Sequence, residues 1–240
     1  MNNLETLFIP EEIKNIKLAG KLVVMIDVLR ASSTIVTALA NGSRGFIPVL
    51  SPDQVKEKAQ QFKKEGVLLG GEREGRKIEG FDLGNSPREY KREAVKEKTI
   101  IFSTTNGVKT LEMVKSAYEI IIGSFLNLHA VCNYCINYQG DILIICAGRD
   151  GKFSLEDTAC AGMIINTLGD VFPVACREVD ANLTARLLYG RFGNNILEIL
   201  RTSQHGRYLE SIGLGGDLKF CSQLDFFNIV PIFRDGIMSI

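Results

Sequence analysis

The chain has 240 residues, and its 28 Lys and Arg balance its 28 Asp and Glu, so the formal net charge is zero. This balance argues against the clustered basic face that nucleic-acid binding requires, and the lack of Trp argues against a surface for stacking bases. No apolar run approaches the ~18 residues of a membrane span, and the first residues lack the pattern of a secretory signal. We therefore expect a cytoplasmic protein that binds neither nucleic acid nor membrane.

Short apolar runs alternate with helical patterns along the chain. The predicted strands span residues 21–27, 45–49, 67–69, 99–102, 119–122, 142–146 and 172–174. The predicted helices span residues 31–41, 52–65, 107–115, 126–137, 155–168, 181–189 and 194–201. Several of the strands are apolar at every position, as in sheets that helices cover on both faces. The alternation predicts an α/β fold with three layers, α/β/α, around a mostly parallel, or mixed, sheet.

No break in composition divides the chain, so we expect a single domain over residues 1–240. Two irregular stretches interrupt the pattern, at about residues 70–87 and 203–240, and a loop as long as the first is usually functional or disordered. Residues 51–54 and 86–89 both predict capping boxes with proline at the first helical position. We expect a homodimer, the commonest symmetric assembly, with the apolar residues 226–230 in the core or at the interface.

Several sequence features argue against familiar types of site. Cys146 in an apolar strand and Cys160 in an apolar helix favour buried free thiols over disulfides. Cys132 and Cys135 lack a second pair of cysteines that would complete a zinc site. The Gly-Lys-Ser/Thr pattern of a nucleotide-binding loop is absent. Leu29 stands where a phosphatase of the haloacid dehalogenase type has a second aspartate.

Four of the predicted strands end in clusters of polar residues. These clusters are Asp27 with Arg30, Glu72 with Arg73, Thr104 through Gly107, and Arg149 with Asp150. If the strands are parallel, all four clusters project from one edge of the sheet. Ligands of open α/β proteins bind at the carboxyl ends of the strands, so the convergence of the clusters predicts a binding site.

The third cluster and the arginines predict binding of an anion. Small residues before a helix leave backbone N–H groups free to face an anion, assisted by the helix dipole. The alternative is that Thr104 or Thr105 only caps the helix. Arg30 and Arg73 could clamp a phosphate or a sulfonate through two hydrogen bonds each, or form surface salt bridges instead.

Three carboxylates are candidate ligands of Mg²⁺, which prefers oxygen atoms. Asp27 follows five apolar residues, and burying such a carboxylate is costly unless it is paired or bound to a cation. Glu72 ends another strand, and Asp157 follows the loop after a third. Asp157 also fits the first turn of a helix capped by Ser154, which is the alternative. His205 is a further candidate, as a catalytic acid.

The clusters occur in a fixed order together with further short motifs. The ordered set is Asp27-Val28-Leu29-Arg30-Ala31-Ser32, Gly71-Glu72-Arg73, Gly80-Phe81-Asp82-Leu83-Gly84-Asn85-Ser86-Pro87, Thr104-Thr105-Asn106-Gly107, Gly123-Ser124-Phe125 and Glu156-Asp157. This set resembles the 2-phosphosulfolactate phosphatase family over nearly the whole chain. The resemblance implies a Mg²⁺-dependent phosphatase that converts 2-phospho-3-sulfolactate into 3-sulfolactate and phosphate, in coenzyme M biosynthesis.

Such a substrate carries a phosphate, a carboxylate and a sulfonate, so its pocket has to balance several negative charges. The expected catalytic residues are Asp27, Arg30 and Arg73, and the expected substrate-binding residues are Arg30, Arg73, Asn85, Thr104, Thr105, Asn106, Gly107 and Arg149. Phosphoryl transfer then depends mainly on positioning and on electrostatic stabilisation. The attacking group stays open between Asp27 and a water molecule. Two other functions stay open as well: binding of an anionic metabolite without catalysis, and a Mg²⁺-dependent lyase.

Overall fold

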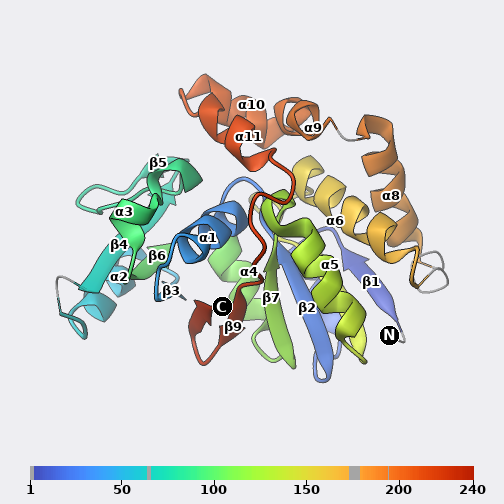
Figure 1. Cartoon of the computed structure of the whole chain (residues 1–240), viewed down its shortest axis with the longest axis horizontal. Coiled ribbons are helices and arrows are strands. Elements are labelled where there is room, and N and C mark those ends of the chain that lie inside the picture. The colour runs from blue at the N-terminus through green and yellow to red at the C-terminus, as the bar shows by residue number, and fades with distance from the viewer. Residues whose placement is uncertain (1–2, 64–65, 173–178, 194) are drawn as a thin grey trace.

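The computed structural model describes residues 3–63, 66–172, 179–193 and 195–240 (Figure 1). Its strands are β1 (Leu4–Leu7), β2 (Lys21–Ile26), β3 (Gly45–Pro48), β4 (Val67–Arg73), β5 (Arg76–Lys77), β6 (Thr99–Ser103), β7 (Glu119–Gly123), β8 (Asp141–Cys146), β9 (Ile232–Arg234) and β10 (Ile237–Ser239). Its α-helices are α1 (Ala31–Ala40), α2 (Pro52–Ala59), α3 (Arg92–Val95), α4 (Gly107–Val114), α5 (Leu128–Asn137), α6 (Leu155–Leu168), α8 (Asp180–Phe192), α9 (Ile196–Thr202), α10 (Gln204–Ser211) and α11 (Gly215–Cys221). Short 3-10 helices are η1 (Pro10–Asn15), η3 (Pro87–Glu89) and η4 (Phe125–Asn127).

The strands of the described residues form one sheet in the order β1-β8-β2-β7-β9-β10-β3-β6-β4-β5. Two blocks of parallel strands, β1-β8-β2-β7 and β3-β6-β4, make up most of this sheet. The C-terminal hairpin of β9 and β10 lies between the blocks and pairs antiparallel with β7 on one side and with β3 on the other. The prediction of a mostly parallel, mixed sheet is confirmed.

The hairpin also sets the direction of one parallel block relative to the other. Three successive antiparallel pairings separate β7 from β3, so these strands run in opposite senses along the ladder. The contact between β10 and β3 is narrow, with one registered pair of residues, Met238 and Phe46. The carboxyl ends of both blocks nevertheless contribute residues, such as Asp27 and Glu72, to one pocket.

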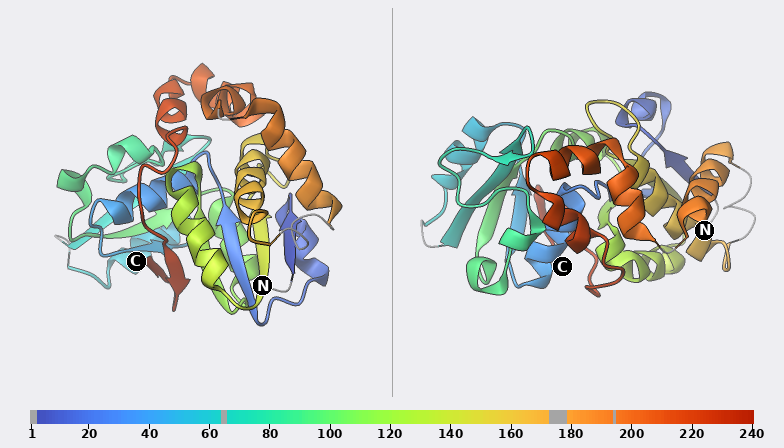
Figure 2. Two further views of the ribbon diagram at one scale, coloured as in Figure 1. Left: turned by 45° about the vertical axis from the view of Figure 1, so that its right-hand side comes forward. Right: turned by 90° about the horizontal axis from the view of Figure 1, so that it is seen from above.

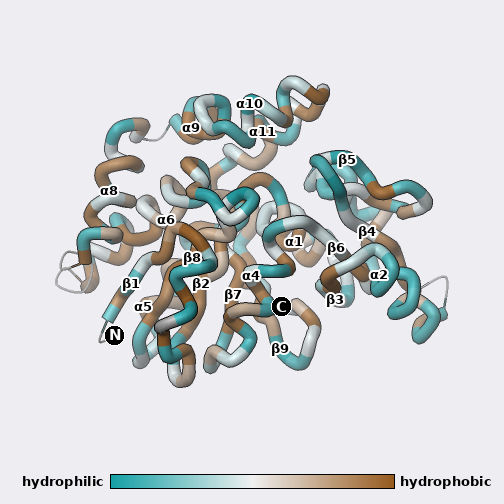
Figure 3. The backbone as a smooth tube through the Cα atoms, turned by 180° about the vertical axis from the view of Figure 1, so that it is seen from behind, coloured by the Kyte–Doolittle hydropathy of each residue, from teal (hydrophilic) through white to brown (hydrophobic). Residues whose placement is uncertain are grey.

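The apolar strands are covered on both faces, which explains why their sequences do not alternate. Along β2, Val24 and Ile26 pack in one hydrophobic cluster, whereas Val23 and Met25 pack in another on the opposite face. The first cluster includes residues of α5 and α6, and the second includes residues of α1 and α4. In Figure 3 the tube is hydrophobic along β2 and β8, where the two clusters meet the sheet. The three-layer prediction is confirmed.

The helices α9, α10 and α11 arch over the carboxyl ends of the strands, at the top of Figure 1 and in the middle of the right-hand view of Figure 2. Residues 203–240, predicted to be irregular, contain α10, α11 and the hairpin of β9 and β10. These elements have eight residues or fewer, too short to give a clear periodic pattern. This part of the chain therefore both completes the sheet and covers the site edge.

Most other predicted elements are present. The helices predicted at residues 31–41, 107–115 and 155–168 match α1, α4 and α6 within one residue. The predicted helix at 126–137 begins as η4 and continues as α5, and the one at 52–65 ends earlier, at Ala59. Residues 64–65, 173–174 and 194, which belong to the predictions at 52–65, 172–174 and 194–201, lie outside the described residues.

One of the two predicted capping boxes is wrong. The Ser51 box is formed, with its hydroxyl accepting from Gln54 N and the Gln54 side chain returning to the Ser51 backbone. Ser86 makes no such cap, because its hydroxyl instead donates to Asp217 Oδ1 at 2.6 Å. Glu89 accepts a hydrogen bond from Gly84 N and so is not available to close the box. A tertiary contact with a distant residue thus replaces the local one.

The structure also bears on the state of the cysteines and on membrane-spanning helices. The prediction of buried free thiols is confirmed for Cys146 and Cys160, and Cys176 lies outside the described residues. Among the described residues, every helix is too short or too polar to cross a membrane.

Candidate functional site

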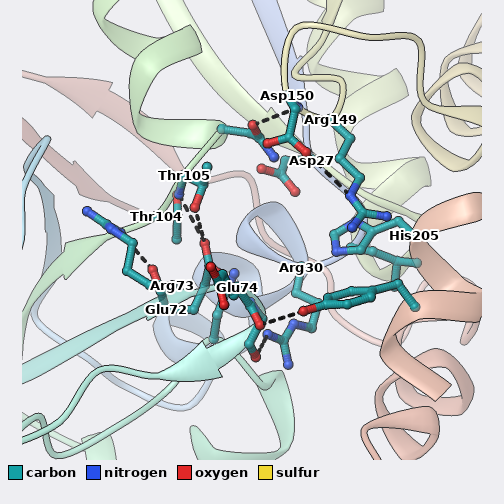
Figure 4. A pocket seen from close by; sticks show the side chains of 15 residues that line it. Asp27, Arg30, Glu72, Arg73, Glu74, Thr104, Thr105, Arg149, Asp150 and His205 are labelled. Atoms are coloured by element: carbon teal, nitrogen blue, oxygen red, sulfur yellow. Dashed lines mark hydrogen bonds and ion pairs between the residues drawn. The ribbon is translucent and has the colours of Figure 1, made fainter. Parts of the chain in front are cut away.

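A cavity of about 390 Å³ lies where the strand ends meet α10 (Figure 4). Its lining residues are Asp27, Leu29, Arg30, Glu72, Arg73, Glu74, Gly75, Asn85, Thr104, Thr105, Asn106, Arg149, Asp150, His205 and Tyr208. All four polar clusters therefore contribute to one site, as the sequence predicted. Of the predicted site residues, only Gly107 and Asp157 are absent from this lining, and both lie directly behind it.

Asp27 is held at the centre of this arrangement, between the starts of two helices. Its Oδ1 accepts a hydrogen bond from Ala31 N, in the first turn of α1, and its own backbone N–H donates to the Ser32 hydroxyl. Its Oδ2 faces Gly107, the first residue of α4, so closely that a Cβ on residue 107 would lie 2.9 Å away. Burial raises the pKa of Asp27 to about 6, with the charges of Glu72 and Glu156 adding to the rise and His205 opposing it.

Glu72 fixes the loops around the cavity through both of its carboxylate oxygens. Oε1 accepts from the backbone N–H and the hydroxyl of Thr105, and Oε2 accepts from Gly75 N. These bonds tie the end of β4 to the loop between β6 and α4. Glu72 lines the same cavity as Asp27, but both of its carboxylate oxygens already accept hydrogen bonds from protein donors.

Asp157 has a similar role behind the cavity. Its Oδ1 accepts from Val28 N at 2.8 Å and its Oδ2 accepts from Gly148 N at 3.2 Å, which joins the loops after β2 and β8. Ser154 caps the helix by accepting from Asp157 N, which is the alternative that the sequence left open. Burial, together with the charges of Glu156 and Asp27, raises the pKa of Asp157 well above its usual value. This geometry favours a structural carboxyl group over a metal ligand.

The residues predicted to bind an anion through the start of α4 are only partly free to do so. The Thr105 N–H donates to Glu72, and the Asn106 side chain accepts from Asp150 N. In contrast, Thr104 and Asn85 line the cavity, and their Oγ1 and Oδ1 atoms are buried without a hydrogen-bond partner. Buried polar atoms of this kind usually have a partner, so these two atoms point to a bound molecule or ion.

The three predicted arginines differ in how far their charge is available to a ligand. Arg30 is buried and donates to Asp217 Oδ2 at 2.8 Å and to Gly75 O at 2.6 Å. Because Asp217 offsets its charge, Arg30 mainly joins the strand end to α11. This differs from the predicted role of a free oxyanion clamp.

Arg73, which the sequence favoured for binding an anion, is less available to a ligand than Arg149. The Arg73 guanidinium points away from Asp27 and donates to Ser103 Oγ and to backbone carbonyls, including Glu72 O (Figure 4). The guanidinium of Arg149 lies 4.8 Å from the centre of the Tyr208 ring, and its nearest acidic group is the exposed Asp150, at 3.8 Å. Arg149 is thus the guanidinium best placed to bind an anion.

The cap helix α10 supplies two further lining residues, His205 and Tyr208. His205 Nδ1 lies 3.5 Å from Glu156 Oε1, and Glu156 is buried in the first turn of α6. Burial alone would raise the pKa of Glu156, but the hydrogen bond and charge of His205 outweigh it and hold that pKa below the usual value. The sequence singled out His205 but missed Tyr208. Their spacing of three residues places them on one face of a helix, a signal that becomes visible only once α10 is recognised.

Among the described residues there is no group of three or more His, Cys, Asp or Glu side chains arranged to hold a metal ion. A Mg²⁺ site does not require one, because Mg²⁺ keeps several waters and commonly uses one or two carboxylates with substrate oxygens. Asp27 offers such a carboxylate, and the partnerless oxygens of Thr104 and Asn85 line the same cavity. The oxygen-only donor set therefore fits Mg²⁺, with Asp27 as the carboxylate.

A three-layer α/β fold with a carboxylate, arginines and partnerless oxygens at the strand ends defines a protein whose site suits a small anionic molecule. Comparison with known proteins makes this more specific. The family model described as 2-phosphosulpholactate phosphatase matches residues 7–236. The chain belongs to this family, which is one of phosphoric monoester hydrolases.

Individual relatives with the same name align with this chain over most of their length. A protein of Caldanaerobacter subterraneus subsp. tengcongensis is 44% identical over 92% of this chain and 91% of its own length. One of Thermotoga maritima is 45% identical over 89% of each chain, and one of Clostridium tetani is 37% identical over 98% of this chain and 99% of its own. Each is named "Probable 2-phosphosulfolactate phosphatase". The resemblance found in the ordered motifs is confirmed.

Proposed function

We propose that the protein is a Mg²⁺-dependent phosphatase that hydrolyses 2-phospho-3-sulfolactate, or a similar phosphorylated hydroxy acid, to the hydroxy acid and phosphate. The observation that carries this proposal is the buried Asp27, which lines a cavity together with Arg149 and with Thr104 and Asn85, two residues that each have a buried oxygen without a hydrogen-bond partner. The substrate is taken from the names of the relatives. A cytoplasmic location, a homodimer and a place in coenzyme M biosynthesis stay predictions.

The charges of the cavity support a substrate with more than one acid group. Arg149 is stacked on Tyr208 at the side of the cavity formed by α10 and could pair with a carboxylate or a sulfonate. Thr104 and Asn85 lie on the side formed by the other loops and could hydrogen-bond phosphoryl oxygens or metal-bound water. A substrate with separated acid groups would use both sides of the cavity at once.

Asp27 is the residue that we assign to the metal, with oxygens of Thr104 and Asn85 in support. A bound Mg²⁺ would neutralise charge on the phosphoryl oxygens. Asp27 could itself attack the phosphorus, or it could orient a water molecule that does so. Glu72 and Asp157 would keep the loops in place, because their oxygens bond to backbone N–H groups of adjoining loops.

The test is phosphate release from 2-phospho-3-sulfolactate and from 2-phospholactate, with Mg²⁺ and after removal of divalent ions by a chelator. We expect turnover that needs Mg²⁺ and that Asp27→Asn reduces by about 10²–10³-fold. Asp170→Asn, at an exposed position outside the cavity, is the matched control and should keep full activity. Tight binding of these acids without phosphate release would instead support a binding protein, and release of products cleaved at carbon would support a lyase.

A further inference from the structure

His205 is the histidine that faces the cavity. It projects from α10 toward the side of the cavity where Asp27 lies (Figure 4). The other histidine of the chain, His129, lies in α5, where it pairs with Asp225. The imidazole group is the side chain most often used for proton transfer near neutral pH. His205 is therefore a candidate for proton transfer at this site.

Glu156 fixes the orientation of His205 from behind. Glu156 is almost completely buried, and Nδ1 of His205 lies 3.5 Å from its Oε1. A buried carboxylate is costly unless it is paired, so this contact stabilises both partners. With Nδ1 turned toward Glu156, the opposite ring nitrogen, Nε2, is the one left for the cavity.

The other hydrogen-bond donors of the cavity are poor sources of a proton. Guanidinium groups such as that of Arg149 stay protonated in proteins. The Tyr208 hydroxyl donates to the backbone carbonyl of Glu74 at 3.0 Å. The Thr105 hydroxyl donates to Glu72 at 3.1 Å. His205 is therefore the donor on this side of the cavity that can give up a proton and recover it.

We propose that His205 is the general acid of the phosphatase reaction and that Glu156 is the residue that positions it. This inference rests on the proposed function. The ester bond between phosphorus and the hydroxy-acid oxygen breaks, and its electron pair passes to that oxygen, which takes the proton from Nε2. A new bond forms between phosphorus and the attacking oxygen, of Asp27 or of water. If Asp27 attacks, water then cleaves the aspartyl phosphate at phosphorus, which releases phosphate and restores the carboxylate. In either case the water that attacks phosphorus gives the proton that restores His205, so the net reaction consumes one water molecule.

The same assignment explains the position of α10. The leaving group of a phosphorylated hydroxy acid is an alkoxide, which is a poor leaving group unless it is protonated as it departs. The acid groups of the substrate would bind beside Arg149 and Tyr208, and Tyr208 shares one face of α10 with His205. The helix that recognises the leaving acid would thus also protonate it.

The test compares substrates whose leaving groups differ in their need for protonation. Phosphate release from 2-phospholactate, an alkyl ester, is measured beside release from 4-nitrophenyl phosphate, whose leaving group departs without a proton. We expect His205→Gln to lower kcat on 2-phospholactate by about 10²–10⁴-fold and to change kcat on the aryl ester by less than about fivefold. Glu156→Gln should show the same selectivity with a smaller loss, and His129→Gln should change neither rate.

Equal losses on both esters would overturn the inference, because damage to the fold does not depend on the leaving group. Unchanged turnover of 2-phospholactate by His205→Gln would overturn it as well. If the unsubstituted protein hydrolyses only the alkyl ester, the kinetic isotope effect of ¹⁸O in the bridging position gives the same comparison, since it rises when the oxygen leaves unprotonated. No hydrolysis of any ester by the unsubstituted protein would contradict the proposed function itself.

Discussion

Arg30 and Asp217 form a buried ion pair across 187 positions of sequence, with Arg30 Nη1 2.8 Å from Asp217 Oδ2. Neither side chain has more than 2% of its surface exposed. The Ser86 hydroxyl donates to the other oxygen of Asp217, and Arg88 lies 3.9 Å from it. The pair therefore fastens α11 to the loop after β2, and with it the helices that cover the site.

Loss of this pair is expected to destabilise the protein strongly. Asp217→Asn would leave the charge of Arg30 buried without its partner, which typically costs about 3–5 kcal/mol. Urea unfolding followed by circular dichroism measures the change, and phosphate release should fall because α10 follows the movement of α11. Glu210→Gln, which breaks the exposed pair with Arg201, should change stability little. A loss below about 1 kcal/mol in Asp217→Asn would show that the pair does not anchor the cap.

Asp27→Asn is expected to stabilise the metal-free protein while it removes activity. The folded protein raises the pKa of Asp27 from 3.8 to about 6. It therefore binds more protons than the unfolded chain between these values, and the free energy of unfolding falls as pH rises through this window. A shift of about two units corresponds to roughly 3 kcal/mol. Denaturant unfolding at pH 4.5 and pH 7.5 in a chelator should show the advantage of Asp27→Asn growing with pH, and an advantage independent of pH would contradict the assignment.

Addition of Mg²⁺ should reverse part of this cost. A cation beside Asp27 stabilises the ionised form, and a ligand at 100 times its dissociation constant adds about 2.7 kcal/mol to the folded state. We expect the melting temperature to rise with Mg²⁺ in the unsubstituted protein and in Asp170→Asn, but not in Asp27→Asn. Thr104→Val and Asn85→Ala should each weaken the rise. An equal rise in all variants would place the metal elsewhere.

Gly107→Ala should disturb Asp27 with little effect on the rest of the fold. The added Cβ would lie 2.9 Å from Asp27 Oδ2 and 3.1 Å from the Ala31 Cβ, so the carboxylate has to move. Misplacement of a catalytic group by about 1 Å can lower rates about 10²-fold, and we expect a loss of about 10–100-fold in kcat. Gly190→Ala is the matched control, because it is also in a helix but has no atom within 4 Å of the new Cβ. Retained activity in Gly107→Ala would mean that this approach is not critical.

Arg149→Lys should weaken substrate binding more than Arg73→Lys. Lysine keeps the charge of Arg149 but loses both the planar fork and the stacking on Tyr208. We expect KM to rise about tenfold, which corresponds to about 1.4 kcal/mol. Arg191→Lys, which removes a similar stacked arginine on Phe192 in α8, is the control. If Arg73→Lys raised KM more than Arg149→Lys, the assignment of the two arginines would have to be exchanged.

The sequence by itself determined the fold class and the location of the site. The fully apolar strands, such as β2, predicted a sheet covered on both faces, because hydrophobic burial leaves no room for polar positions there. The polar clusters at four strand ends predicted the cavity, and the ordered motifs identified the family. These features depend on residues near each other in the chain, where local patterns carry the information.

Only the tertiary structure decided what each side chain at the site is available to do. Asp217 offsets the charge of Arg30 from 187 positions away, and Glu72 and Asp157 bond to the backbone N–H groups of other loops. Asp27 lines the cavity with its Oδ2 beside Gly107, and His205 lines the same cavity because α10 folds back over the strand ends. A hydrogen bond or ion pair depends on distances of a few ångströms between remote segments, and local sequence does not encode those distances.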